Sequence, residues 1–441
     1  MTAPAFLSPR QKDKMMKKLL LAGICVFILA DCPGNPDQQT GTYRPNVLLI
    51  IVDDEDPPMN VLENDQIRTP SFRKLAGRST VFSSAHCAAP ACAPSRAAML
   101  TGVAPYRSGS YYNNHNLWKT DSEYASVDNL PAWFRKNGYL AAGFGKVFHA
   151  GHDELTRSDW TEGYYVPYDG HRNHVELRRH VPGVTMMQHE QWHFGPLPDE
   201  WDRDDPEKMQ QDTENANRVI GLLNEEHDRP FFIALGIYKP HVPYHVAQRY
   251  YDMYPPGSIE IPAGYKADDL DDVPYCAKWL ATRRGFHKYI TDNNLWKQVL
   301  QAKMASVTYS DEQVGRVLEA LEKSRYRNNT IVWFTGDNGF HTGEKDHWSK
   351  FALWEKATRV PMMVSLPGQK ESRKCPVPVS MLDIYPSLVD LCGLPDPGSH
   401  RLDGTSLAGM LKGSSGERGE PVLCTHGRDT VSYTHLTLPT N

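Results

Sequence analysis

The segment from Asn46 to Val52 constrains the fold of this 441-residue chain more than any other. Its sequence, NVLLIIV, is a continuous apolar run rich in β-branched residues, without the polar alternation of a half-exposed strand. Such a run predicts a strand buried on both faces, which is typical of a largely parallel sheet with helices on each side. We therefore expect an α/β fold whose large, mostly parallel central sheet is sandwiched by helices.

Acidic residues follow two of the apolar runs. Asp53 and Asp54 come directly after the first run, and Asp337 follows the later run Thr330–Phe334 after two residues. Ligands of such sheets bind at the carboxyl ends of the strands, which is where these side chains fall. Adjacent carboxylates usually mark a solvated loop, and Asp-Asn-Gly most often forms a turn. Two carboxylates placed directly after a buried strand are better explained by a bound cation.

A stretch of small residues contains the sequence CAPSRAAMLTG, from Cys92 to Gly102. This stretch resembles the signature of the type I sulfatases, in which a maturation enzyme oxidises the cysteine to formylglycine. The hydrate of that aldehyde offers one hydroxyl that attacks sulfur and a second that lets the covalent sulfate ester collapse. Two structural alternatives are a disulfide, for instance with Cys87, and a small buried thiol. The full pentapeptide with its downstream Thr-Gly favours the catalytic interpretation.

Two further motifs follow predicted strands. Lys146 and His149 stand in GFGKVFH, which resembles the G-K-x-x-H motif in the form of the iduronate-2-sulfatase-like branch of the family. A lone Lys or His in a loop is usually solvated surface. His241 lies between two prolines after the apolar run Pro230–Gly236. That rigid turn suits a positioned acid, although a structural turn with an incidental histidine is the alternative.

The resemblance also implies a role for each site residue. The metal ligands would be Asp53, Asp54, Asp337 and Asn338 together with the modified Cys92. Arg96 would steady the modified side chain, and the sulfate would be surrounded by Lys146, Lys350, His149 and His241. An all-oxygen shell suits Ca²⁺ better than zinc, and Asn338 stands where many relatives have His. We expect His241 to protonate the leaving oxygen and His149 to serve the formylglycine hydroxyl.

The resemblance thus implies a calcium-dependent sulfatase acting on O-sulfate esters of carbohydrates or glycosaminoglycan-like polysaccharides. One alternative is a phosphate or phosphonate ester hydrolase of the same alkaline phosphatase-like fold. Another is a non-catalytic sulfoglycan-binding protein in which Cys92 is never converted. The net charge of −5 provides no global positive field for nucleic acid, so an anion must be bound by a local cluster.

Several segments outside the motifs carry separate predictions. The segment Met15–Lys18, made basic by its two lysines, and the short apolar run after it indicate a secretory signal peptide, and hence a periplasmic, cell-surface or secreted protein. Cys32 is a candidate for lipidation. The predicted organisation is an upstream segment with signal peptide (1–32), a linker (33–44), the catalytic domain (45–393), the start of a truncated C-terminal subdomain (394–430) and a foreign tail (431–441).

Helices are predicted at Thr69–Gly77, from Arg96 onward, and at Asp128–Asn137, Trp296–Lys323 and Val379–Gly393. Residues 150–228 are polar and rich in histidine without the ligand spacing of a zinc motif. We expect an insertion of substrate-contacting loops there. The sparse cysteines allow disulfides, but their spacing does not determine the pairing; the candidates are Cys87, Cys276, Cys375, Cys392 and Cys424.

Overall fold

A computed structural model describes residues 44–55, 66–119, 123–150, 156–169, 184–185, 193–199, 209–262, 264–414, 417–427 and 433–434. The predicted signal peptide, Cys32 and most of the predicted tail lie outside these residues. Two residues of that segment, β14 (Tyr433–Thr434), pair antiparallel with β13 (Leu423–Cys424). Every helix in the described ranges is too short or too polar to span a bilayer.

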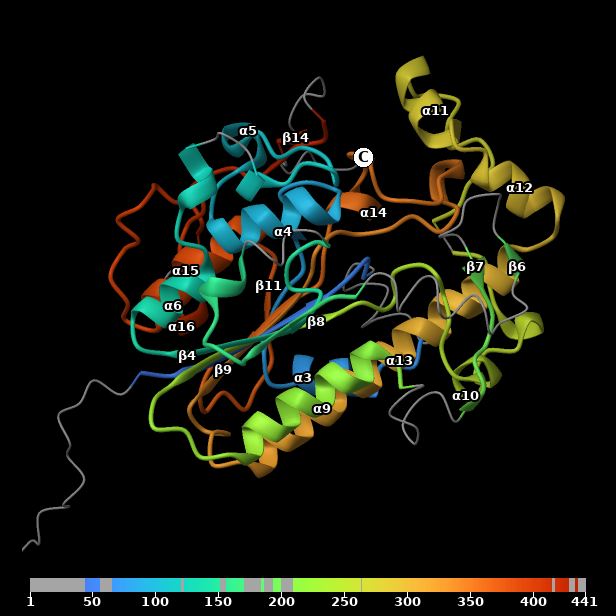
Figure 1. Cartoon of the computed structure of the whole chain (residues 1–441). Helices are drawn as coiled ribbons and strands as arrows, with labels where there is room; N and C mark the ends of the chain where they lie inside the picture. The colour runs from blue at the N-terminus through green and yellow to red at the C-terminus, as the bar shows by residue number, and fades with distance from the viewer. Residues whose placement is uncertain are drawn as a thin grey trace, which may run out of the picture. The chain divides into compact units, whose positions relative to one another are not determined.

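An eight-stranded sheet forms the centre of the body that begins at Arg44 (Figure 1). Its order is β11 (Arg373–Cys375), β2 (Thr80–Phe82), β10 (Met362–Ser365), β9 (Thr330–Gly336), β1 (Asn46–Val52), β8 (Phe231–Ile237), β4 (Leu140–Gly145) and β5 (Tyr165–Pro167). The strands from β9 to β5 run parallel, whereas β10 pairs antiparallel with both of its neighbours. The predicted α/β class with a mostly parallel sheet is confirmed.

Strand β1 contributes to two hydrophobic cores, which explains its uninterrupted apolar sequence. Leu48, Ile50 and Val52 belong to one core, and the alternate residues Val47, Leu49 and Ile51 belong to the other. All six side chains are fully buried. Because successive side chains of a strand point to opposite faces, the middle of a strand covered on both sides is apolar. The polar residue of β1, Asn46, stands at the start of the strand and accepts a hydrogen bond from the Phe231 N–H at 3.0 Å.

Helices cover both faces of the sheet (Figure 1). On one side lie α3 (Pro70–Ala76), α9 (Gln211–Asn224) and α13 (Trp296–Lys323). The other side carries α4 (Cys92–Thr101), α6 (Leu130–Lys136), α15 (Ile384–Leu391) and α16 (Ala408–Lys412). Shorter elements complete the body: α5 (Pro105–Ser108), α10 (Gln248–Asp252), α11 (Tyr275–Thr282), α12 (Phe286–Asp292), α14 (Glu355–Thr358), β3 (Ala85–His86), β12 (Val379–Ser380), β6 (Val184–Thr185) and β7 (His193–Phe194).

The structure corrects three local predictions. Helix α4 begins at Cys92, one turn earlier than the predicted start at Arg96. The predicted helix Val379–Gly393 begins as strand β12, because Val379 and Ser380 pair with β3, and it becomes α-helical only at Ile384. Part of the predicted loop region 150–228 is helix α9, which buries Ala216, Val219, Leu222 and Leu223 in the core.

Disulfides are absent from the described residues, where the cysteines are free thiols. Cys87 and Cys424 come close, with 3.9 Å between their buried Sγ atoms. Cys92 forms no bond with Cys87, so the disulfide alternative for that residue is wrong.

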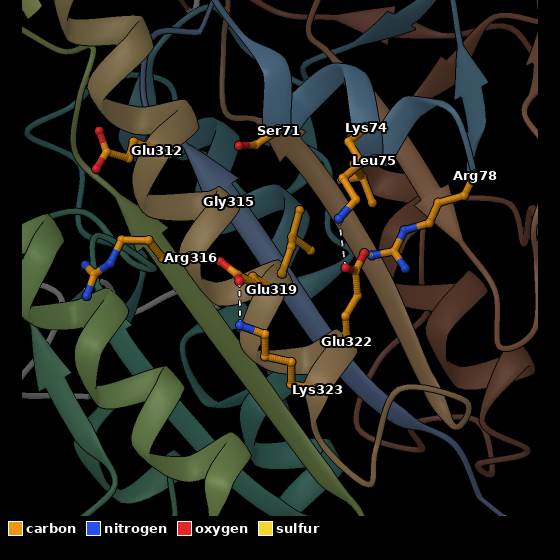
Figure 2. A pocket seen from close by; sticks show the side chains of 11 residues that line it. Ser71, Lys74, Leu75, Arg78, Glu312, Gly315, Arg316, Glu319, Glu322 and Lys323 are labelled. Carbon is orange, nitrogen blue, oxygen red and sulfur yellow. Dashed lines mark hydrogen bonds and ion pairs between the residues drawn. The ribbon is translucent and has the colours of Figure 1, made fainter.

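Helices α3 and α13 also line a groove on the side of the sheet away from α4 (Figure 2). Its charges are paired across and along the two helices: Lys74 lies 2.8 Å from Glu322, and Lys323 lies 2.5 Å from Glu319. Arg78 adds a second contact to Glu322 at 3.3 Å. The groove is therefore largely neutralised and offers no concentrated charge to a ligand.

The amino end of α3 is held by a side chain from α13. Asp311 accepts hydrogen bonds from the backbone N–H groups of Phe72 at 2.7 Å and Ser71 at 3.1 Å. Thr69, the residue at the N-cap position, makes no capping bond with its own side chain. Burial raises the pKa of Asp311 to about 6, from an ordinary value of 3.8.

We expect Asp311→Ala to lower the free energy of unfolding by about 1–3 kcal/mol, because two buried donors lose their acceptor. Asp311→Asn should lose less, since it keeps one acceptor oxygen. The pKa of Asp311 is higher in the folded state than in the unfolded state, so ionisation of this carboxyl disfavours the folded state. The stability of the wild type should therefore fall as pH rises from 3.8 to about 6, and Asp311→Asn should remove this pH dependence. Urea denaturation across this interval measures both effects. The exposed Glu319→Ala serves as the control, and equal losses in the two Ala variants would contradict the capping role.

Candidate active site

The acidic residues predicted as metal ligands lie side by side at the carboxyl ends of β1 and β9. Val52 and Gly336 are register partners, so Asp53 and Asp337 leave the sheet at neighbouring positions. The Asp54 backbone N–H donates to Asp337 Oδ1 at 3.1 Å. Asp54 has φ 54°, the left-handed conformation that non-glycine residues rarely adopt, and such local strain is typical of functional sites.

Cys92 faces these carboxylates from the first residue of α4. Its Sγ lies 3.3 Å from Asp53 Oδ1 and is almost completely buried. One potential ligand atom from each of Asp53, Asp54, Cys92 and Asp337 falls within 4.8 Å of the others. The start of a helix directs free backbone N–H groups toward such a position, which favours an anion there.

Arg96 connects the cluster across three elements. Its Nε donates to Asp337 Oδ2 at 2.8 Å, and its Nη2 lies 3.4 Å from Asp53 Oδ1. Its Nη1 donates to the carbonyls of Lys146 and Val147 in the loop after β4. The guanidinium therefore fixes the relative positions of α4, both acidic strand ends and this loop. Its role in steadying the modified side chain of residue 92 stays a prediction.

Two lysines flank the sulfur of Cys92. Lys350 Nζ lies 2.6 Å from Cys92 Sγ and forms an ion pair with Asp54. Lys146 Nζ lies 3.8 Å from the same sulfur and pairs with Asp53. Both side chains are buried. The predicted sulfate-binding lysines are thus in place around the predicted nucleophile.

The two predicted histidines differ in position. His241 Nε2 lies 3.6 Å from Asp54 Oδ2, while its Nδ1 lies 2.6 Å from the Val242 carbonyl and 2.9 Å from the Tyr238 hydroxyl. A carbonyl accepts, so Nδ1 carries the hydrogen and Nε2 faces the cluster. His149 is partly exposed at the end of its loop, where its Nδ1 donates to the Ala150 carbonyl at 3.3 Å. Its role in the reaction stays a prediction.

Burial and neighbouring charges set the protonation states. Burial, with the Asp337 and Asp53 carboxylates, raises the pKa of the Cys92 thiol well above its usual range. An unmodified thiol is therefore held neutral and is a poor nucleophile. Burial also acts to raise the pKa of Asp53, but Lys146 and Arg96 outweigh it and the net shift is downward. Burial and Lys146 lower the pKa of His241 well below its usual range, which favours the neutral ring.

The donor set fits a hard divalent cation. Asp53, Asp54 and Asp337 supply carboxylate oxygens. Asn338 Nδ2 donates to Asp54 Oδ1 at 2.7 Å, whereas its buried Oδ1 has no hydrogen-bond partner in the described part of the chain. A buried carbonyl oxygen without a partner costs free energy unless a ligand satisfies it. Oxygen donors of this kind are the ligands that Ca²⁺ prefers.

Lys303 is a site residue that the sequence interpretation missed. It lies on α13, is buried, and donates from Nζ to the Asp54 backbone carbonyl at 2.7 Å. This hydrogen bond helps to hold Asp54, the residue with the left-handed backbone, in its position. A signal was present in the sequence, since Lys303 falls between Leu300 and Val307 on the apolar face of the predicted helix.

We expect Lys303→Met to weaken binding of a divalent cation about 10–100-fold, the usual cost of losing an outer partner of a metal ligand. The measurement is the rise of the melting temperature during a Ca²⁺ titration, which needs no catalysis. Asp337→Ala gives the reference for a lost ligand, and the exposed Lys297→Met on the same helix is the matched control. A Lys303→Met titration curve that matches the wild type would remove Lys303 from the site.

Fold and site together define a hydrolase in which a buried side chain at a helix start is surrounded by carboxylates and ammonium groups. The family model described as "Sulfatase" matches residues 45–394. The chain belongs to the sulfatase family, and its enzyme class is that of the sulfuric ester hydrolases.

Relatives agree with this assignment. The chain is 34% identical to a sulfatase of Formosa agariphila over 93% of this chain and 81% of the relative. It is 30% identical to iduronate 2-sulfatase of Mus musculus over 95% of this chain and 78% of the relative. The phosphonate monoester hydrolase of Agrobacterium radiobacter has a similar fold, with a TM-score of 0.67 and 20% identity over 86% of this chain and 80% of that chain.

Proposed function

We propose that this sulfatase hydrolyses O-sulfate esters of sulfated carbohydrates, including glycosaminoglycan-like polysaccharides, with a formylglycine made from Cys92 and with Ca²⁺. The observation that carries the proposal is the position of Cys92 Sγ, 3.3 Å from Asp53 and 2.6 Å from Lys350. A neutral thiol is a poor nucleophile, and it neutralises none of the buried charges around it. The hydrated aldehyde of formylglycine would supply a hydroxyl there that attacks sulfur.

Charge balance supports an anionic substrate. Three carboxylates, from Asp53, Asp54 and Asp337, face the three cations of Arg96, Lys146 and Lys350. Bound Ca²⁺, held by the carboxylates and Asn338, would make this neutral set positive and stabilise negative charge on the sulfuryl oxygens. In the reaction, Lys146 and Lys350 bind those oxygens, and Arg96 keeps the reacting side chain in position.

Carbohydrate as the substrate class is supported by a relative. Iduronate 2-sulfatase, whose name specifies a sulfated sugar acid, is 30% identical over 95% of this chain. The alternative substrates, phosphonate or phosphate esters, are supported only by the similar fold of a phosphonate monoester hydrolase, which is 20% identical to this chain. We also propose that the protein is exported and that a formylglycine-generating enzyme is its maturation partner.

The first test compares two esters that have the same leaving group and differ only in the acid, sulfate or phosphate. Protein made in a host with the maturation enzyme should hydrolyse an aryl sulfate much faster than the matching aryl phosphate. Mass spectrometry should find formylglycine in the Cys92 peptide, and Cys92→Ala should be inactive. Faster phosphate hydrolysis would favour the alternative hydrolase, and an unmodified thiol from the competent host would favour the non-catalytic binding protein.

A second test concerns His241 as the acid that protonates the leaving oxygen. Its Nε2, unprotonated in the neutral ring, would first take up a proton, which the negative charge of a bound sulfate beside it favours. A sugar alkoxide leaves poorly without a proton, so His241→Ala should lower kcat on a sugar sulfate about 10²–10⁴-fold. A nitrophenolate leaves readily, and the loss on nitrophenyl sulfate should be small. Equal losses on both substrates would reassign His241 to sulfate binding, while no loss on either would return it to a structural role.

A further inference from the structure

The arm formed by α11 and α12 carries exposed aromatic and basic side chains outside the cluster around Cys92. Tyr275 is 82% exposed and Trp279 is 50% exposed. Arg283 and Arg284 follow α11 and are also exposed. Figure 1 shows α11 standing out from the body of the molecule. Exposed apolar side chains that gather in one patch often mark a surface for ligand binding or protein interaction.

The arm is connected directly to the sulfate-binding lysine. His347 Nδ1 lies 3.1 Å from the Ala281 carbonyl of α11, and its Nε2 lies 2.7 Å from the Lys350 carbonyl. The ring of Phe351 forms a second contact between the arm and Lys350. Arg284 Cζ lies 5.1 Å from the ring centroid, and Lys350 Nζ lies 6.0 Å from the same centroid. One partly exposed aromatic ring therefore separates Arg284 from the catalytic cluster.

The two arginines have no carboxylate partner within the described residues, unlike the nearby lysines. Lys278 lies 3.9 Å from Asp271, and Lys345 lies 2.9 Å from Asp269. Partial desolvation and the adjacent Arg283 guanidinium lower the pKa of Arg284. The Arg283 guanidinium lies 4.9 Å from the Trp279 ring centroid, so an aromatic face and a cation are presented together.

We propose that Arg283, Arg284 and Trp279 form a subsite that binds a second sulfate or carboxylate group of a polyanionic glycan. This inference rests on the proposed function, since the first sulfate of the same glycan would lie at Cys92. Guanidinium groups bind planar or tetrahedral oxyanions through two parallel hydrogen bonds, which an unpaired arginine is free to make. Trp279, with Tyr275 beside it on α11, offers an apolar face on which a sugar ring packs.

The test measures binding separately from catalysis. In an inactive Cys92→Ala background, calorimetry gives the affinity for a heparin-derived hexasaccharide, whose neighbouring sugars carry sulfate and carboxylate groups. Arg283→Gln/Arg284→Gln should weaken this affinity about tenfold or more, the effect of losing a charge-assisted contact. Trp279→Ala should weaken it too. Arg325→Gln is the matched control, because that exposed arginine lies elsewhere and pairs with Glu226.

Kinetics with Cys92 intact then distinguish the two proposals. For the double arginine variant, KM for a sulfated oligosaccharide should rise while kcat/KM for nitrophenyl sulfate stays at the wild-type value. Unchanged melting temperatures would show that the variants fold. Binding equal to that of the Arg325→Gln control, or equal losses on both substrates, would overturn the subsite. A wild type inactive on every sulfate ester would overturn the proposed function instead, and the binding result would still decide the subsite.

Discussion

The ion pairs of Arg96 with Asp337 and Asp53 are the interaction on which the rest of the site depends. Buried charges are costly unless they are paired and fully hydrogen-bonded, and removing one partner leaves an uncompensated charge. Arg96 is fully buried and is held by carboxylates from two strand ends and by two carbonyls of the loop after β4. The same contacts that satisfy the guanidinium therefore fix the distance between α4 and the sheet edge, and with it the position of Cys92.

Close backbone packing completes this arrangement. Gly145 has φ 75°, and a side chain on it would meet the Gly236 carbonyl oxygen at 2.2 Å. A side chain on Gly236 would in turn meet the backbone of Lys146 at 2.1 Å. The two glycines thus let the loop that carries Lys146 lie directly on β8. Both positions therefore require glycine for space, and Gly145 also for its left-handed backbone.

The sequence predicted best what depends on local pattern, and it failed where contacts between distant segments decide. The strand Asn46–Val52 and the helix Trp296–Lys323 have the predicted bounds, because two-sided burial and amphipathic spacing leave strong patterns. The clustering of Asp53 and Asp337 follows from the parallel order. By contrast, pairing with β3 turns Val379 and Ser380 into a strand. The role of Lys303 and the position of Arg284 beside Phe351 follow only from tertiary contacts.

Charges are paired in the cluster around Cys92 and unpaired at Arg283 and Arg284 on the arm. On our proposals, the first group of residues carries out the hydrolysis and the second contributes to the choice of substrate. Within the cluster the cations of Arg96, Lys146 and Lys350 each face a carboxylate, so Cys92, the proposed reacting residue, lies among balanced charges. On the arm, Arg283 and Arg284 lie in the turn between the short helices α11 and α12, and no carboxylate among the described residues pairs with them. A substitution there alters the affinity for distant anionic groups without disturbing the ion pairs that position Cys92. On the proposed function, the arm is therefore where the preference for a particular sulfated glycan can change while the hydrolysis of the sulfate ester is preserved.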